Sequence, residues 1–401
     1  MKQDLDWRER FRFPCPGEPA GLPEPEGMAL LAGDVSPRKV YVELTTECNM
    51  NCGMCVRHTW DSPGGVMSRE TFGRVLTQIA DLPGAAAVNF SGYGEPMSHP
   101  HFLEFVSAAK RAGLIVETVT NGALLDDEAI DGIVELGLDR LVVSVDGLTA
   151  DSCQMLHAGS FADVGPRLRR LYHVRLSRGQ SRPEVALEFV ATKRNIHELP
   201  KLKALSLAYG FSGILVTNLI PHTRQQAEQI LYDRYATARR SSRASPANPC
   251  VDLPLMDGGS SAAEVIDRLR RTGTYLRSGG TDAFGAAPRC RFVTEGRLAV
   301  RWDGSVSPCL PLMHSHRYYF RDKPREIRCY HVGTVDETPL SEIWLGAEYR
   351  AFRDRVRRFD FSPCIDCGGC DLRLTNEADC SGSQFPRCGE CLWAAGLVQC
   401  P

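Results

Sequence analysis

Three cysteines lie close together in the stretch CNMNCGMC, as Cys48, Cys52 and Cys55. Clustered cysteines in a chain of this kind are more typical of metal ligands than of disulfides. Structural zinc takes four ligands, usually from two paired knuckles; here no second knuckle follows, although His58 could supply a fourth ligand. A 4Fe–4S cluster is also held by cysteine thiolates. Three thiols would leave one of its irons open. The two chemistries to compare are therefore zinc and an iron–sulfur cluster with a free iron.

A second group of cysteines lies in the last third of the chain. Cys290 and Cys309 flank the stretch RFVTEGRLAVRWDGSVSP, whose alternating residues predict a β-hairpin turning at Asp303-Gly304. The candidate metal ligands of this region are Cys290, Cys309, Cys364, Cys367, Cys370, Cys380, Cys388, Cys391 and Cys400. They are one more than two four-cysteine clusters need. Zinc knuckles are the alternative for the C-x2-C pairs Cys364/Cys367 and Cys388/Cys391.

Composition limits the other classes of function. The chain has 401 residues, 16 cysteines and a net charge of −2. No basic block predicts a nucleic-acid or membrane surface. The charged, Pro-rich N-terminus has no apolar segment typical of a signal peptide, and no apolar run approaches the roughly 20 residues of a membrane span. We therefore expect a soluble cytoplasmic protein.

Apolar runs and amphipathic stretches alternate along the first half of the chain. Strands are expected at 39–46, 85–92, 114–122, 140–147, 184–192 and 213–220, and helices at 68–82, 101–113, 126–137, 163–178 and 195–210. This alternation predicts an α/β fold with a parallel sheet. A doubly wound open sheet is the rival, but the first strand–helix loop holds cysteines and no phosphate-binding glycine motif. We expect a partial (β/α)6 TIM-like barrel with its chemistry at the carboxyl ends of the strands.

The composition also divides the chain. Residues 1–37 predict an irregular lead-in and 38–221 the barrel. From 222 to 285 the alternation stops, which predicts a linker or insertion with a helix near 262–272. Residues 286–401 predict a small cysteine-rich domain that depends on metal to fold.

The spacing C-x3-C-x2-C after the first strand resembles the radical SAM superfamily, and GYGEP, after the second strand, resembles its GGEP-type loop. The resemblance implies a 4Fe–4S cluster on Cys48, Cys52 and Cys55, with S-adenosylmethionine on its open iron. Gly94 and Glu95 would then hold the methionine ammonium. The remaining cofactor contacts that it implies are Met54, Asn121, Ser144 and Asp146.

The pattern Cys290, Gly304, Cys309 resembles the opening of the SPASM domain, which carries auxiliary 4Fe–4S clusters. The resemblance implies one or two such clusters here. The later cysteines depart from the usual SPASM spacing, so it does not assign each thiol to a cluster.

Several stretches, among them CVRHTW, RWDGSVSPCLPLMHSH and CGECLWAAGLVQCP, resemble radical SAM/SPASM maturases assigned to tungsten-containing oxidoreductases. The implied activity is hydrogen abstraction by a 5′-deoxyadenosyl radical during maturation of a tungsten- or molybdenum-pterin enzyme or its cofactor. Implied partners are a ferredoxin or flavodoxin as electron donor and that oxidoreductase. The alternatives are a peptide-modifying maturase acting on a precursor peptide and a non-enzymatic iron–sulfur carrier or scaffold.

Overall fold

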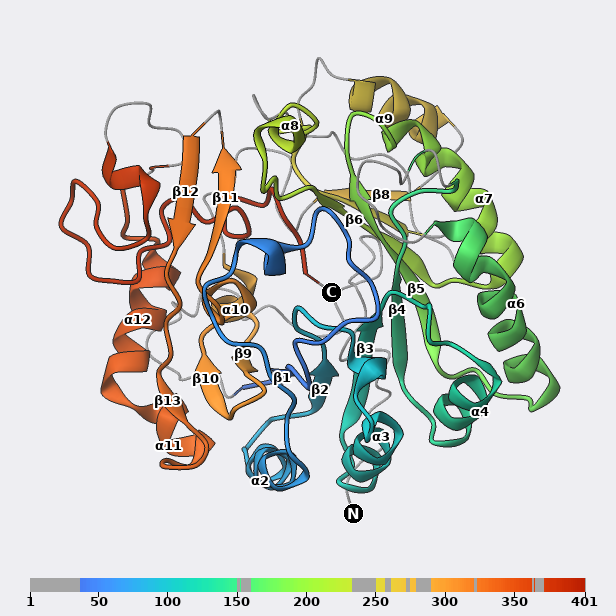
Figure 1. Cartoon of the computed structure of the whole chain (residues 1–401), viewed down its shortest axis with the longest axis horizontal. Coiled ribbons are helices and arrows are strands. Elements are labelled where there is room, and N and C mark those ends of the chain that lie inside the picture. The colour runs from blue at the N-terminus through green and yellow to red at the C-terminus, as the bar shows by residue number, and fades with distance from the viewer. Residues whose placement is uncertain are drawn as a thin grey trace, which may run out of the picture.

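One twisted sheet forms the centre of the molecule (Figure 1). The computed structural model describes residues 37–149, 152, 160–232, 250–256, 261–271, 275–278, 290–320, 323–362, 364 and 371–400. Within them the sheet has 11 strands in the order β13-β10-β9-β1-β2-β3-β4-β5-β6-β7-β8. Strands β1 to β8 are parallel to their neighbours and follow one another in chain order, as in a (β/α) barrel that remains open.

The six expected strands are present, so the predicted fold class is confirmed. They are β1 (Lys39–Val42), β2 (Ala87–Phe90), β3 (Ile115–Thr120), β4 (Arg140–Ser144), β5 (Glu184–Ala191) and β6 (Gly213–Asn218). The expectation that the alternation stops at 222 is wrong. Two further parallel strands follow, β7 (Cys250–Leu253) and β8 (Tyr275–Ser278), with the predicted helix between them as α9 (Ser261–Arg271). Each of these strands includes polar residues, as CVDL and YLRS, and is bordered by Pro or Gly, so no apolar run marks it in the sequence. The predicted domain boundaries remain predictions.

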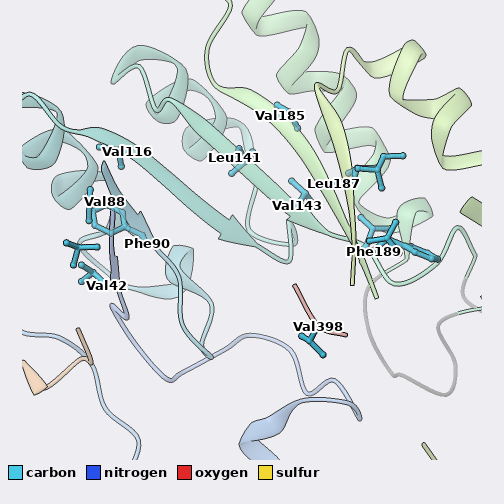
Figure 2. Packing of buried hydrophobic residues seen from close by; sticks show 14 of the residues in the cluster. Val42, Val88, Phe90, Val116, Leu141, Val143, Val185, Leu187, Phe189 and Val398 are labelled. Carbon is cyan, nitrogen blue, oxygen red and sulfur yellow. The ribbon is translucent and has the colours of Figure 1, made fainter. Parts of the chain in front are cut away.

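Helices cover the convex side of the sheet (Figure 1). They are α2 (Arg69–Ala80), α3 (Phe102–Arg111), α4 (Asp127–Glu135), α6 (Phe161–Ser177) and α7 (Leu199–Tyr209). Their starts follow from the sequence, since Ser68 caps α2 and Asp126 caps α4 by accepting main-chain hydrogen bonds. Alternate strand residues pack in the core, as Val185, Leu187 and Phe189 of β5 do (Figure 2). The other face of each strand is left to line the concave side.

The cysteine-rich region continues the same sheet. Strand β9 (Arg297–Val300) pairs in parallel with β1, and β10 (Ser305–Ser307) returns antiparallel to β9 and pairs with β13 (Gly333–Thr334). The predicted hairpin is therefore confirmed, with Gly304 at a φ of 84° in its turn, a conformation that favours glycine. The remaining elements are α8 (Arg224–Ala227), α10 (Arg291–Thr294), β11 (His316–Phe320), β12 (Lys323–Ile327), α11 (Leu340–Leu345) and α12 (Ala347–Arg358), with short 3-10 turns at η1 (Val56–Thr59), η2 (Pro96–Ser98), η3 (Ile196–Glu198), η4 (Leu310–Leu312) and η5 (Asp371–Leu374).

Residues 396–400 run along β6. The side chain of Asn218 donates to the carbonyl of Leu397 (2.8 Å), and the main-chain N–H of Gln399 donates to the hydroxyl of Thr217 (3.0 Å). In Figure 1 this red segment reaches the middle of the arc of strands. It therefore brings Cys400 to the concave side. None of the described helices has the length and apolar character needed to cross a membrane.

Candidate functional site

Cys48, Cys52 and Cys55 lie on the loop between β1 and η1, and all three are partly buried. Burial raises the pKa of Cys48. Burial, followed by Asp146 and the two neighbouring thiols, raises the pKa of Cys52 to about 12. A thiolate at Cys52 therefore needs a positive partner, and the iron ions of a cluster would supply one. The residues present fit such a cluster.

Arg57 organises this loop and was not predicted. Its Nε donates to the sulfur of Cys55 (3.2 Å), and its other nitrogens donate to the carbonyls of Thr46 (2.9 Å) and Met50 (3.1 Å). One guanidinium thus joins both ends of the loop and faces a thiol that would carry negative charge. His58, the candidate fourth zinc ligand, instead has its ring 3.0 Å from the carbonyl of Cys52.

The GYGEP loop packs directly on the cysteine loop. The N–H of Glu95 donates to the carbonyl of Glu47 (2.8 Å). A Cβ at Gly94 would lie 2.2 Å from the carbonyl oxygen of Thr45 and 2.6 Å from that of Glu47. Only glycine fits at this crossing, so the motif places the two loops in contact.

The side chain of Glu95 is 2% exposed and faces β3. It accepts hydrogen bonds from the hydroxyl of Thr120 (2.8 Å), the N–H of Asn121 (2.8 Å) and the N–H of Met97 (3.1 Å). Burial raises the pKa of this carboxyl, and the three hydrogen bonds oppose that rise. In this structure Glu95 therefore ties its loop to the end of β3. Its contact with a ligand ammonium stays a prediction.

The other expected cofactor contacts lie at the same edge of the sheet. Asn121 donates to the side chain of Asn49 (2.9 Å) and lies 3.7 Å from the sulfur of Cys48. Asp146 is 3% exposed, and its Oδ1 has no hydrogen-bond partner among the described residues. Burial raises its pKa to about 7. Ser144 ends β4 nearby, and Met54 lies half-buried in the cysteine loop.

Five of the nine C-terminal candidates gather near the hairpin: Cys290, Cys309, Cys388, Cys391 and Cys400. Burial raises the pKa of Cys309 well above its usual range, and Cys290, Cys391 and Cys388 add to the effect. The indole N–H of Trp393 donates to the sulfur of Cys400 (2.9 Å). Residues far apart in the sequence therefore form one thiol-rich site of a composition that suits a cluster.

Cys364 and Cys380 both lie near Ser362. The N–H of Cys364 donates to the carbonyl of Ser362 (2.7 Å), and the hydroxyl of Ser362 lies 3.2 Å from the sulfur of Cys380. Cys367 and Cys370 lie outside the described residues. The structure thus places seven of the nine candidate thiols.

Sequence reasoning also missed the pair Glu43 and His314, whose side chains meet 2.8 Å apart. They are 271 positions apart in the chain. The sequence did contain one signal for this pair. Glu43 is an acid at the end of a strand buried on both faces, and a buried carboxylate needs a charged or hydrogen-bonding partner.

Comparison with known proteins agrees with this geometry. The radical SAM superfamily model matches residues 42–184, and the model of the SPASM iron–sulfur cluster-binding domain matches 290–371. A Pyrococcus furiosus protein named "Tungsten-containing aldehyde ferredoxin oxidoreductase cofactor-modifying protein" is 30% identical over 367 residues, covering 90% of this chain and 96% of the relative. The chain belongs to the radical SAM superfamily.

One further relative and one solved structure are also similar to this radical SAM protein. A PqqA peptide cyclase from Gluconobacter oxydans is 31% identical over 183 residues, covering 45% of this chain and 49% of the cyclase. Streptococcus suis SuiB bound to S-adenosylmethionine superposes with a TM-score of 0.55 at 15% identity, covering 84% of this chain and 72% of SuiB, which shows a shared fold. The protein is a radical SAM enzyme whose cofactors are 4Fe–4S clusters and S-adenosylmethionine, so the carrier alternative is set aside.

Proposed function

We propose that this radical SAM enzyme abstracts hydrogen from the pterin cofactor of a tungsten or molybdenum oxidoreductase, or from a precursor of that cofactor, during its maturation. The observation that carries the proposal is the extent of the match to the cofactor-modifying relative. It spans 96% of that protein and includes both the barrel and the cysteine-rich domain. The peptide cyclase match covers about half of each chain.

In this proposal Cys48, Cys52 and Cys55 hold the cluster, and Arg57 fixes the loop that carries them. A bound 4Fe–4S cluster supplies the electron that splits S-adenosylmethionine into methionine and the 5′-deoxyadenosyl radical. Gly94 lets the GYGEP loop approach the main chain at Thr45 and Glu47, directly before the cysteine loop. The residues expected to orient the bound S-adenosylmethionine are Met54, Gly94, Glu95, Asn121, Ser144 and Asp146.

The C-terminal thiols are proposed to hold one or two auxiliary clusters. The group near the hairpin has one thiol more than a four-cysteine cluster uses. Cys364 and Cys380 would belong to a second cluster, together with Cys367 and Cys370. Clusters of low potential need a reductant of low potential, and we propose a ferredoxin or flavodoxin as the electron donor.

The test is to produce a tungsten-dependent aldehyde oxidoreductase in cells that contain this enzyme, lack it, or contain its Cys52→Ser variant. Bound tungsten and aldehyde oxidation are then measured on the purified oxidoreductase. Loss of tungsten or of activity in both the absent and the variant strain supports the proposal. Equal metal and activity in all three strains would overturn it.

A peptide-modifying activity is the second candidate, because the peptide cyclase relative is 31% identical over 183 residues. It predicts a mass change in a short peptide incubated with the reconstituted enzyme, S-adenosylmethionine and dithionite. Peptides encoded beside this protein's gene are the substrates to use. An unchanged peptide mass under conditions that yield 5′-deoxyadenosine would count against this candidate.

A further inference from the structure

Glu188 carries a carboxyl group on the concave side of the sheet. Its neighbours Leu187 and Phe189 pack in the core, and side chains alternate along a strand, so Glu188 faces the other way. It pairs in register with Ser144 of β4, which places these two side chains on the same face. Ser144 is the last residue of β4, so Glu188 lies towards the carboxyl ends of the strands, where the cysteine loop and the GYGEP loop also begin.

The concave side is closed halfway along these strands and open at their carboxyl ends. The inward residues halfway along β3, β4 and β5 are buried: Glu117, Val142 and Ala186. The next inward residues towards the carboxyl ends are partly exposed: Val119, Ser144 and Glu188. Even the valine keeps exposed surface, which a close-packed interior does not leave. A ligand can therefore reach the carboxyl of Glu188 from the carboxyl ends of the strands.

The carboxyl of Glu188 forms no hydrogen bond or ion pair with the other residues that the structure describes. Glu117, on the same side of the sheet, shows the contrast, because it pairs with Lys39 and accepts a hydrogen bond from Asn89 (3.0 Å). Burial, followed by the charge of Asp146, raises the pKa of Glu188 to about 8, so water hydrates the ionised carboxyl poorly. A carboxyl in such surroundings destabilises a fold unless a ligand supplies its partner.

Glu188 also lies close to the residues expected to hold the cofactors. Asp146, whose charge acts on Glu188, also acts on the thiol of Cys52, where burial and then Asp146 raise the pKa. Burial and then the charge of Glu188 raise the pKa of Cys400, which the last residues of the chain bring to the concave side. A ligand held by Glu188 would therefore lie near the loop on which the radical is expected to form.

S-adenosylmethionine is the competing ligand, because its ammonium and its adenine amino group are also hydrogen-bond donors. The cofactor contacts expected from the sequence lie on or shortly after strands β1 to β4: Met54, Gly94, Glu95, Asn121, Ser144 and Asp146. Glu188 lies on β5, one strand further from the cysteine loop in the order of the sheet. This position favours the substrate over the cofactor as its ligand.

We propose that Glu188 binds the aminopyrimidinone edge of the substrate's pterin ring, with one carboxylate oxygen accepting the ring N–H and the other accepting the neighbouring amino group. This inference rests on the proposed function for the identity of the ring. A carboxylate presents two acceptors in one plane and pairs bidentately with two parallel N–H donors, as it does with arginine. Two such donors also favour the ionised carboxyl and oppose the effect of burial. The partly exposed side chains of Val119 and Val190 offer apolar surface to the flat ring.

The test is equilibrium dialysis of two probes against the anaerobically reconstituted enzyme saturated with S-adenosylmethionine. The probes are pterin and 1,3-dimethyllumazine, a similar bicycle without N–H donors. Wild-type enzyme is expected to bind pterin at least about 10-fold more tightly, as the loss of hydrogen bonds to a charged acceptor implies. Glu188→Gln keeps the shape of the side chain but replaces one acceptor by a donor, and is expected to bind both probes equally. Glu184→Gln is the matched control, since it makes the same change on the same face of β5, roughly 13 Å away at the amino end, and should keep the preference.

Iron content and thermal midpoint of each variant establish that it is folded, and the wild-type comparison of the two probes needs no variant. Retention of the pterin preference by folded Glu188→Gln would overturn the proposal. So would an equal loss of S-adenosylmethionine affinity in this variant, which would make Glu188 a cofactor contact. A wild-type enzyme that binds neither probe, or both equally, would also overturn it, even if that enzyme still activates the tungsten enzyme. A preference that depends on Glu188, in an enzyme without effect on the tungsten enzyme, would keep the site and refute the maturation function.

Discussion

Replacing Gly94 by alanine is expected to separate the GYGEP loop from the cysteine loop. The added Cβ would lie 2.2 Å from the carbonyl oxygen of Thr45 and 2.6 Å from that of Glu47. Both oxygens belong to the main chain, so rotation of a side chain cannot relieve the clash. Carbon–oxygen contacts are comfortable at about 3.3 Å or more, so one loop must retreat by roughly 1 Å. The hydrogen bond from Glu95 to Glu47, now 2.8 Å, would be lost with that movement.

A misplacement of about 1 Å in a site that orients its reactants costs on the order of 100-fold in rate. The assay is 5′-deoxyadenosine formation from S-adenosylmethionine and dithionite, by liquid chromatography, with iron counted per chain. We expect Gly94→Ala to keep the iron on the C-terminal thiols and to lose about 100-fold in this rate. The matched control is Gly73→Ala at an exposed position of α2, where an added Cβ meets nothing within 4 Å. A Gly94→Ala enzyme as fast as Gly73→Ala would refute the reasoning.

Three further perturbations follow from single contacts. Burial alone would raise the pKa of Glu117, but the charges of Lys39 and Arg140 and the hydrogen bonds from Lys39 and Asn89 lower it from 4.5 to about 2. The lowered pKa stabilises the fold above pH 4.5, and this stabilisation is lost as the pH falls towards 2. Glu117→Gln should therefore lower the free energy of unfolding by about 3 kcal/mol at pH 7. In urea unfolding, the free energy of unfolding of the variant should fall less steeply with decreasing pH than that of the wild type. Arg57→Lys should release iron to a chelator faster, and an unchanged rate would contradict the role of its three hydrogen bonds. Asn218→Ala should increase amide hydrogen exchange around Leu397, with a loss of about 1–3 kcal/mol in protection. Unchanged exchange there would show that the hydrogen bond from Asn218 to Leu397 does not hold residues 396–400 against β6.

The sequence predicted the elements that depend on local pattern. Strand β5 has an apolar residue at most positions, and Ser68 and Asp126 mark their helix starts, so these elements could be found without tertiary information. Strands β7 and β8 could not, since no apolar run marks either segment and each forms where the edge of a neighbouring strand is available. Whether a strand edge is free to pair depends on the folded sheet and cannot be recognised from the sequence of the segment that pairs with it.

The residues of the candidate site also fall into two kinds: those that the local sequence brings together and those that only the folded sheet brings together. The spacing of Cys48, Cys52 and Cys55 is local, and one loop brings them together. The grouping of Cys290 with Cys388 and Cys391, and the meeting of Glu43 with His314, depend on the docking of β9 against β1. No local pattern encodes which distant strand takes that edge. This is why the thiols could be proposed as ligands but not assigned to groups.

The parallel pairing of β1 with β9 has a consequence for biosynthesis. Tyr41 on β1 and Arg297 on β9, which share a hydrogen bond, are 256 positions apart. At roughly 5–20 residues per second, a ribosome needs about 13–50 s to make the intervening chain. During that interval one edge of β1 has no partner, and an open strand edge is a template for aggregation. We therefore expect slow translation to reduce the yield of folded enzyme, because it prolongs the time during which this edge has no partner.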